Sequence, residues 1–303
     1  MASRNLLLRA ASLGFAAATL WTGCEPRSTA PRTTPASASS SSNLTNPPAP
    51  ASALTAAQIV ARPDLVHARL KAKNQYYQGE ARFAEDPAAG LVAEIVEAAV
   101  VDLSPLQGLP LGALDLRATP VADLAPLAGM PLSMLALEQT RVTDLAPLQG
   151  MKLKKLYLNQ TAVRDLTPLA GMPLVELMAV DAKIEDLSPL EGAPLEGLWL
   201  NRNPVTNLAA LARSPLVTLT LEGTRVTDLG PLASVKSLQR LHIGDTAVQD
   251  LSPVASLPLT RLIFNPARIT NGLEAVRRMT SIEELGVTLE QRMPPAQFWE
   301  QFK

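Results

Sequence analysis

The sequence has little of the material from which most catalytic and metal sites are built. Its 303 residues include one cysteine, Cys24, and two histidines, His67 and His242. A single thiol cannot form a disulfide or a thiolate metal site within one chain. The histidines lie far apart, and the HExxH, GxSxG and GxxxxGK[ST] motifs are absent from the sequence. We therefore expect a protein that is not an enzyme and binds no cofactor or metal.

An excess of charge of one sign is also lacking. The 27 Lys and Arg residues nearly balance 28 Asp and Glu residues, which leaves a net charge of -1. Nucleic acids and anionic membrane surfaces attract strongly basic proteins, so neither is an expected partner. Apolar residues make up 47% of the chain, which excludes general disorder and predicts a large buried core.

A short apolar segment near the start predicts export. Arg4 and Arg9 precede an apolar run over residues 13–21, which ends in Thr-Gly-Cys at residues 22–24. The run is too short to span a bilayer comfortably, and a basic region followed by such a run is typical of a signal peptide. We expect the signal peptide to be residues 1–23.

The position of Cys24 resembles the lipobox of bacterial lipoproteins, in which a cysteine follows a small residue at the end of the apolar run. That resemblance implies that Cys24 is acylated and anchors the mature chain to a membrane. Trp21 departs from the family pattern, which usually has Leu there. The alternative is an ordinary signal peptide cut near residues 16–18, which would leave a soluble periplasmic or secreted protein.

Residues 24–54 are almost wholly Ser, Thr, Pro and Ala after the first few positions. Such a composition cannot bury enough apolar surface to offset the entropy lost on ordering. It predicts a disordered linker that would separate the folded part from a membrane anchor.

The rest of the chain contains an internal repeat. A D-L-x-P-L pentad, or a variant of it, recurs at intervals of 21 residues with a single interval of 22. The pentads start at Asp102, Asp123, Asp144, Asp165, Asp186, Asn207, Asp228, Asp250 and Asn271. The proline suits a tight turn, and the aspartate can accept from backbone amides to start a 3₁₀ turn.

A second pattern lies between the pentads and identifies leucine-rich repeats. It reads L-x-x-L-x-L-x-x-T-x-V, as in residues 111–121 and 153–163. Leucines at every second position predict a short strand with one buried face. We therefore predict an α/β solenoid: a right-handed leucine-rich-repeat arc over residues 102–289, with short parallel strands on the concave face and 3₁₀ turns on the convex face.

These 21-residue repeats resemble those of the internalins, a family of bacterial leucine-rich-repeat proteins. The resemblance implies the solenoid fold, but it indicates little about function. The chain departs from the family at the position usually held by Asn, where only Asn203 keeps the family residue. Threonine replaces it at Thr119, Thr140, Thr161, Thr224 and Thr246.

An open solenoid needs a cap at each end to cover its core. We expect residues 55–101 to form the N-terminal cap, with one or two helices interrupted at Pro63 and a degenerate first coil. Residues 290–303 are the expected C-terminal cap. Its aromatics Phe298, Trp299 and Phe302 would cover the last coil or, alternatively, form an exposed docking tail.

The strand register predicts a binding surface. The residues between the last two strand leucines should point from the concave face, and we expect them to be Asp115, Ala136, Tyr157, Met178, Trp199, Thr220, His242 and Ile263. Tyr157, Met178 and Trp199 would form a contiguous protein-binding column about 10 Å long. Its predicted polar flanks are Lys155, Asn159, Gln160, Glu176, Asn201 and Arg202.

A second polar cluster surrounds His242. Arg240, Asp245 and Arg261 should lie near it, and we interpret this cluster as a solvated face. The alternative for the column of Tyr157, Met178 and Trp199 is that two aromatics and a Met on an exposed strand reflect strand propensity alone.

The sequence thus favours a monomeric, non-enzymatic binding module tethered to the cell envelope. Its partner would be a protein or, less favoured, a glycan bound on the concave face. Export as a lipoprotein would place it at a membrane of the envelope, such as the outer membrane. A structural spacer without a discrete ligand is the alternative, and the two differ in whether the central column is needed.

Acylation can be tested by replacing Cys24 with Ser. The wild-type chain should fractionate with detergent-extracted membranes, whereas the variant should move to the soluble envelope fraction because it lacks the acylated thiol. Unchanged partitioning would contradict the anchor.

Overall fold

The structure is a computed structural model that describes residues 54–302. The predicted signal peptide, Cys24 and nearly all of the predicted linker lie outside these residues, so those interpretations stay predictions. The elements below belong to a unit that begins at Thr55.

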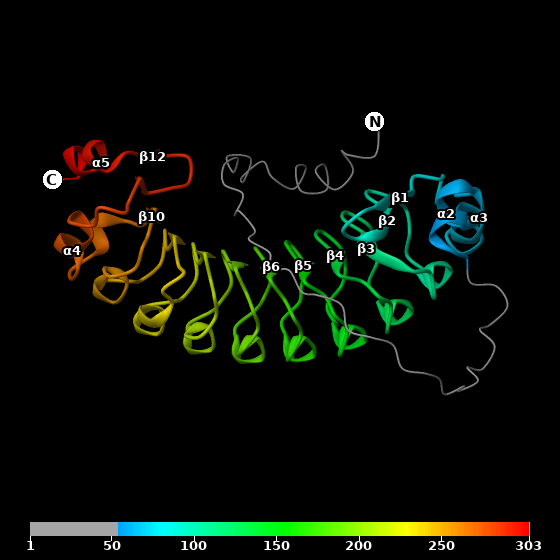
Figure 1. The fold of residues 1–303 in the computed structure, drawn as a ribbon, viewed down its shortest axis with the longest axis horizontal. Coiled ribbons are helices and arrows are strands. Elements are labelled where there is room, and N and C mark those ends of the chain that lie inside the picture. Colours follow the sequence, from blue (N-terminus) through cyan, green and yellow to red (C-terminus); the bar gives the residue numbers. More distant parts are fainter. Residues whose placement is uncertain (1–53, 303) are drawn as a thin grey trace, which may run out of the picture. The chain divides into compact units, whose positions relative to one another are not determined.

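Short strands repeat through this unit and pair in parallel with their neighbours. Within residues 54–302 they belong to one sheet, whose strand order is the order of the sequence. Figure 1 shows the strands along one side of the stack and the turns along the other. The repeated strands are β3 (Leu111–Asp115), β4 (Met134–Ala136), β5 (Lys155–Tyr157), β6 (Glu176–Met178), β7 (Gly197–Trp199), β8 (Thr218–Thr220), β9 (Arg240–His242) and β10 (Arg261–Ile263). The predicted right-handed leucine-rich-repeat arc is confirmed.

The leucines that specify the strands form the core of the stack. In the coil that contains β5, Leu156 and Leu158 are both 0% exposed, and the corner residue Val163 is equally buried. Burying such a side chain is worth about 1.5–3 kcal/mol before the entropy of ordering is subtracted. Because one coil buries only a few of them, its stability depends on its neighbours.

Eight of the nine pentads form a 3₁₀ turn, as predicted. The aspartate side chain accepts a hydrogen bond from the amide two residues ahead, for example at 2.8 Å from Ala146 to Asp144. The turns are Ser104–Leu106, Ala125–Leu127, Ala146–Leu148, Thr167–Leu169, Ser188–Leu190, Ala209–Leu211, Gly230–Ser234 and Ser252–Val254. At Asn271 the pattern ends, because Gly272 adopts a positive φ of 81° and the helix α4 (Leu273–Arg277) follows.

The single 22-residue interval is accommodated within a turn. Gly230–Ser234 has five residues where the other pentad turns have three. Strand β8 therefore still pairs with β9 residue for residue, with Thr220 opposite His242. The insertion leaves the strand face undisturbed.

Threonine replaces the family asparagine by bonding within its own coil. The hydroxyl of Thr161, for example, donates to the carbonyl of Leu158 at 2.7 Å. Thr119, Thr140, Thr224 and Thr246 donate in the same way to the carbonyl three residues back. A hydroxyl has one proton to donate, so these residues form no such bond to the preceding coil.

Asn203 instead connects two coils. Its amide donates to the carbonyls of Leu200 in its own coil and Ala179 in the preceding coil, and its carbonyl accepts from the Ile184 amide at 3.0 Å. The preceding coil has Ala182 at the threonine position. Ala182 has no hydroxyl to reach the carbonyl of Ala179, so Asn203 supplies the missing hydrogen bond from the next coil.

The N-terminal part consists of two short helices and a hairpin. The helices are α2 (Ala56–Ala61) and α3 (Asp64–Lys73), with Pro63 between them. Strands β1 (Arg82–Asp86) and β2 (Gly90–Glu94) are antiparallel, and β2 continues the parallel stack to β3. The sequence pattern did not predict β1. The side chain of Asn74 joins α3 to the first pentad by accepting from the amides of Val101 and Asp102 at 2.8 and 2.9 Å.

The C-terminal part folds back over the last coil. Its elements are the turn Pro266–Arg268, α4, β11 (Glu284–Gly286), β12 (Arg292–Met293) and α5 (Pro295–Gln301). Phe298 is 0% exposed, with its ring centroid 5.7 Å from that of Phe264. It is therefore unavailable as an exposed docking side chain.

In the part of the chain that the structure describes, no helix is both long and apolar enough to cross a membrane.

The hydrogen bonds from Asn203 to the preceding coil predict that substitutions at positions 182 and 203 have coupled effects on stability. Replacing Asn203 with Thr should lower the free energy of unfolding by about 1–3 kcal/mol, because the Ala179 carbonyl and the Ile184 amide lose their partner. Adding Ala182→Thr to that variant should recover part of the loss, since the new hydroxyl can donate to the Ala179 carbonyl.

Urea unfolding of the wild type, both single variants and the double variant gives this coupling as a double-mutant cycle. Ala182→Thr alone should bring no gain, because Asn203 already donates to the same carbonyl. Additive effects of the two substitutions would contradict the assignment.

Candidate functional site

The concave face carries three columns of side chains, because alternate residues of each strand point to the same side. The middle column is in the predicted register: Tyr157 lies opposite Met178, Met178 opposite Trp199, and Trp199 opposite Thr220. Asp115, Ala136, His242 and Ile263 continue this column at the two ends. The register of all eight predicted positions is therefore confirmed.

The exposure of this column differs from the expectation. Tyr157, Met178 and Trp199 are partly exposed in the centre of the stack. The residues at the ends are buried: Asp115, Ala136, Thr220, His242 and Ile263 are all at most 7% exposed. The expectation that every position would be exposed on the concave surface is wrong, because other side chains and the C-terminal segment cover the ends. The accessible part is the centre.

Trp199 is held against its own strand. A side-chain carbon on Gly197 would lie 2.5 Å from the indole atoms Cη2 and Cζ3, so the ring occupies the space above this glycine. Only glycine at position 197 permits this placement without a clash. The indole is therefore preorganised on the concave face.

Tyr157 and Lys155 are both connected to Glu176 on the next strand. The Tyr157 hydroxyl donates to Oε1 of Glu176 at 3.1 Å, and Nζ of Lys155 lies 3.0 Å from its Oε2. Burial, followed by the negative charge of Glu176, raises the pKa of Tyr157. The phenol is consequently neutral and remains a hydrogen-bond donor at physiological pH.

The other predicted flanking residues form hydrogen bonds between neighbouring coils. Asn159 donates to Glu138 and accepts from the Val180 amide, at 2.9 and 2.8 Å. Gln160 accepts from Gln139 at 2.6 Å. These contacts fix the polar edge beside Tyr157.

Arg202 and Asn201 continue this edge beside Trp199. Arg202 forms a two-pronged ion pair with Asp181 of the preceding coil and thereby lowers the pKa of that carboxyl. Asn201 donates to Glu222 of the following coil at 3.3 Å. All nine predicted binding residues thus lie on or beside the central column, which we call the central patch: Lys155, Tyr157, Asn159, Gln160, Glu176, Met178, Trp199, Asn201 and Arg202.

A buried charge cluster at the N-terminal end of the concave face was missed by sequence reasoning. Arg117 pairs with Asp115 at 2.6 Å, with side chains 12% and 1% exposed, and approaches Glu138 at 3.6 Å. Burial raises the pKa of Glu138, and Arg117 opposes that rise. The available sequence signal was the presence of charged residues on the concave side of the coils that contain β3 and β4.

The cluster around His242, at the opposite end, is a solvated face only in part: the Asp245 side chain is 76% exposed and Arg240 and Arg261 are partly exposed, whereas His242 is buried. The Nε of Arg240 donates to Thr218 at 2.9 Å, and Arg261 pairs with Glu284 of β11. His242 itself is 3% exposed, and burial lowers its pKa to about 4. Its ring is therefore neutral at physiological pH.

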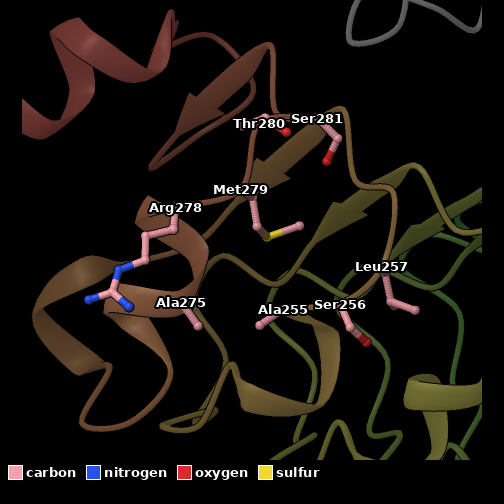
Figure 2. Close-up of a pocket in the computed structure, with 8 residues that line it drawn as sticks. All are labelled: Ala255, Ser256, Leu257, Ala275, Arg278, Met279, Thr280 and Ser281. Carbon is pink, nitrogen blue, oxygen red and sulfur yellow. The ribbon is translucent and has the colours of Figure 1, made fainter.

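Away from the concave face, an open hollow of about 480 Å³ lies beside α4 and the turn Ser252–Val254. Figure 2 shows Met279 pointing into it and the Arg278 head group extending away. Its lining is otherwise made of small or uncharged residues: Ala255, Ser256, Leu257, Ala275, Thr280 and Ser281. This hollow brings no candidate catalytic groups together. Within residues 54–302 there is also no cluster of three His, Cys, Asp or Glu residues suited to a metal ion.

The burial of His242 predicts a dependence of stability on pH. Its pKa falls from 6.5 in the unfolded chain to about 4 in the folded chain, so the unfolded chain binds the proton first on acidification. Stability should fall as the pH drops below about 6.5, with a total loss of roughly 3 kcal/mol once the pH is below about 4.

The measurement is urea unfolding of the wild type and of His242→Phe at about pH 7.5 and about pH 4.5. Other titrating groups contribute equally to both proteins, so the wild type should lose more stability than the variant. An equal loss in the two proteins would show that His242 is not buried in its neutral form.

Comparison with known proteins supports the fold. No protein-family model matches the chain, and no curated protein matches it. Among solved structures, an internalin, InlF, from Listeria monocytogenes superimposes with a TM-score of 0.58 at 22% identity, covering 78% of each chain. Internalin C2 from the same organism gives a TM-score of 0.56 at 24% identity, covering 71% of this chain and 100% of that one. The chain is thus a leucine-rich-repeat protein with internalin-like repeats of 21 residues.

Proposed function

We propose that the chain is a non-enzymatic module that binds a protein through the central patch of its concave face. The observation that carries this proposal is the burial pattern of the middle column. Tyr157, Met178 and Trp199 stay partly exposed side by side, whereas the column is buried at both ends. Large aromatic and Met side chains within a polar rim are the usual composition of a protein-binding hot spot.

The conformational order of the patch supports tight binding. The indole of Trp199 is positioned above Gly197, and the Tyr157 hydroxyl is bonded to Glu176. Side chains that are already held in place lose little conformational entropy when a partner binds. The three stacked strands extend the column over about 10 Å, which a protein side-chain cluster can cover.

A structural role is the second candidate function, and the hydrogen bonds between coils favour it. Gln139 bonds Gln160, and Asp181 pairs with Arg202, each across 21 residues of sequence. Such bonds stiffen the stack whether or not a ligand is present. A rigid spacer would use these contacts and would not need the exposed aromatics.

Tethering to the cell envelope is the further part of the proposal. It rests on the sequence around Cys24, which lies outside the described residues. An acylated Cys24 followed by the predicted linker would hold the concave face away from a membrane.

The proposal is tested by affinity capture from envelope extract with the full chain and with a Tyr157→Ala, Trp199→Ala double variant. A captured protein is identified, purified and titrated against both. The double variant should bind at least about 100-fold more weakly, because each truncation removes a hot-spot side chain.

The matched control is an Arg164→Ala, Glu185→Ala double variant. It changes two exposed side chains in the same stretch of coils but outside the strands, and it should bind as the wild type does. Circular dichroism checks that every variant is folded. Equal affinity of wild type and the Tyr157, Trp199 variant would favour the structural role.

A further inference from the structure

Three residues near Trp199, of which Asn201 belongs to the central patch, bury polar atoms that have no hydrogen-bond partner. Among the described residues, five such side-chain atoms occur, and four of them belong to Asn201, Thr220 and His242. These are Oδ1 of Asn201, Oγ1 of Thr220, and Nδ1 and Nε2 of His242. Folded proteins pair nearly all of their buried polar atoms, so each exception needs an explanation.

The three residues lie next to one another and next to Trp199. Thr220 is opposite Trp199 on one side and opposite His242 on the other, and Asn201 lies two residues after Trp199, just beyond the end of β7. They come from three successive coils, and each is at most 8% exposed. The residues that carry the unpartnered atoms are therefore neighbours, and we call them the polar cluster, which continues from Trp199 toward the C-terminus.

The loop between β11 and β12 covers the His242 end of this cluster. A side-chain carbon on Gly244 would lie 2.8 Å from Nε2 of His242 and 3.3 Å from the carbonyl oxygen of Val287, so ring and loop meet above this glycine. The charge of Glu290 on the same loop acts on both His242 and Glu222. Figure 1 shows β12 on the strand side of the stack, in agreement with these contacts.

The loop is attached by bonds to the C-terminal segment itself. Arg292 of β12 donates to the Leu289 carbonyl, and within the loop the Gln291 amide donates to the Thr288 hydroxyl at 3.2 Å. Arg292 also pairs with Glu284 at 3.3 Å. A movement of residues 287–291 about this attachment would uncover the His242 end of the cluster without disturbing the stacked coils.

We propose that Asn201, Thr220 and His242 form a covered polar subsite, which takes an uncharged hydrogen-bonding side chain of the partner protein when residues 287–291 move aside. This inference rests on the proposed function, because the subsite extends the same concave surface beyond Trp199.

The chemistry of the three side chains selects an uncharged group. Asn201 offers an acceptor, Thr220 can donate and accept, and the neutral ring of His242 has one donor and one acceptor. A primary amide or a hydroxyl can donate and accept at once, so it can satisfy this mixed set. A carboxylate can only accept, and it would also meet the negative charges of Glu222 and Glu290.

The experiment measures the affinity of the purified partner for full-length variants. Thr220→Val keeps the side-chain shape and removes the hydroxyl, and His242→Phe keeps a planar ring and removes both nitrogens. Each should weaken binding by about three- to tenfold, because the partner's polar group loses a hydrogen bond. The matched control is Thr227→Val, an exposed position in the same coil as Thr220, which should leave the affinity unchanged.

A variant that should increase the affinity tests whether residues 287–291 cover the subsite. Arg292→Gln removes the side-chain bonds from Arg292 to Leu289 and Glu284, while Glu284 keeps its pairing with Arg261. It should tighten binding by about two- to tenfold, because a larger fraction of the chain is then open and competent to bind. Hydrogen exchange of residues 287–291 in the wild type should also become faster when the partner is bound.

The results of these experiments distinguish failure of the subsite from failure of the proposed function. Weaker binding by Thr220→Val and His242→Phe, together with faster loop exchange in the complex, supports the subsite. The subsite alone is overturned if Thr220→Val and His242→Phe leave the affinity unchanged and loop exchange is unchanged or slower in the complex, while the Tyr157→Ala, Trp199→Ala variant has lost the partner. If the Tyr157, Trp199 variant binds the partner as the wild type does, the proposed function and the subsite both fail.

Discussion

Backbone hydrogen bonds from each coil to the next are the constraint on which the structure depends. The amide of Leu158 bonds the carbonyl of Met178, and the amide of Gln160 bonds that of Val180. Such bonds keep successive strands opposite each other, so equivalent side chains form columns along the face. A coil can gain a residue only in a segment that makes none of these strand bonds. The extra residue accordingly lies in the turn Gly230–Ser234.

The ends of the stack determine which part of the concave face stays accessible. Each end must be closed because it would otherwise expose apolar core. At the C-terminus the closing segment also extends over Ile263 and His242, and at the N-terminus Asp115 is buried with Arg117. The partly exposed aromatic column therefore lies in the centre, as far as possible from either end.

Sequence reasoning succeeded where the repeat itself carries the information. Leucines at every second position placed Tyr157, Met178 and Trp199 in one column, and the pairing has that register. It failed where burial comes from residues outside the repeat. Nothing in the strand pattern indicates that the loop after β11 would reach His242, because that contact depends on how the chain folds back at Gly286 and beyond.

The same limit applies to side-chain choices within a coil. Thr161 can be interpreted alone, since its hydrogen bond stays within its own coil. Ala182 cannot be interpreted alone, because the hydrogen bond that a threonine there would donate to the Ala179 carbonyl is supplied by Asn203 of the next coil. If an array changes length by losing one copy, the hydrogen bond of Thr161 is lost or kept together with its own coil. Loss of the copy that contains Asn203 would instead leave the Ala179 carbonyl of the preceding copy without its side-chain donor, so a change of length at this point carries an added cost.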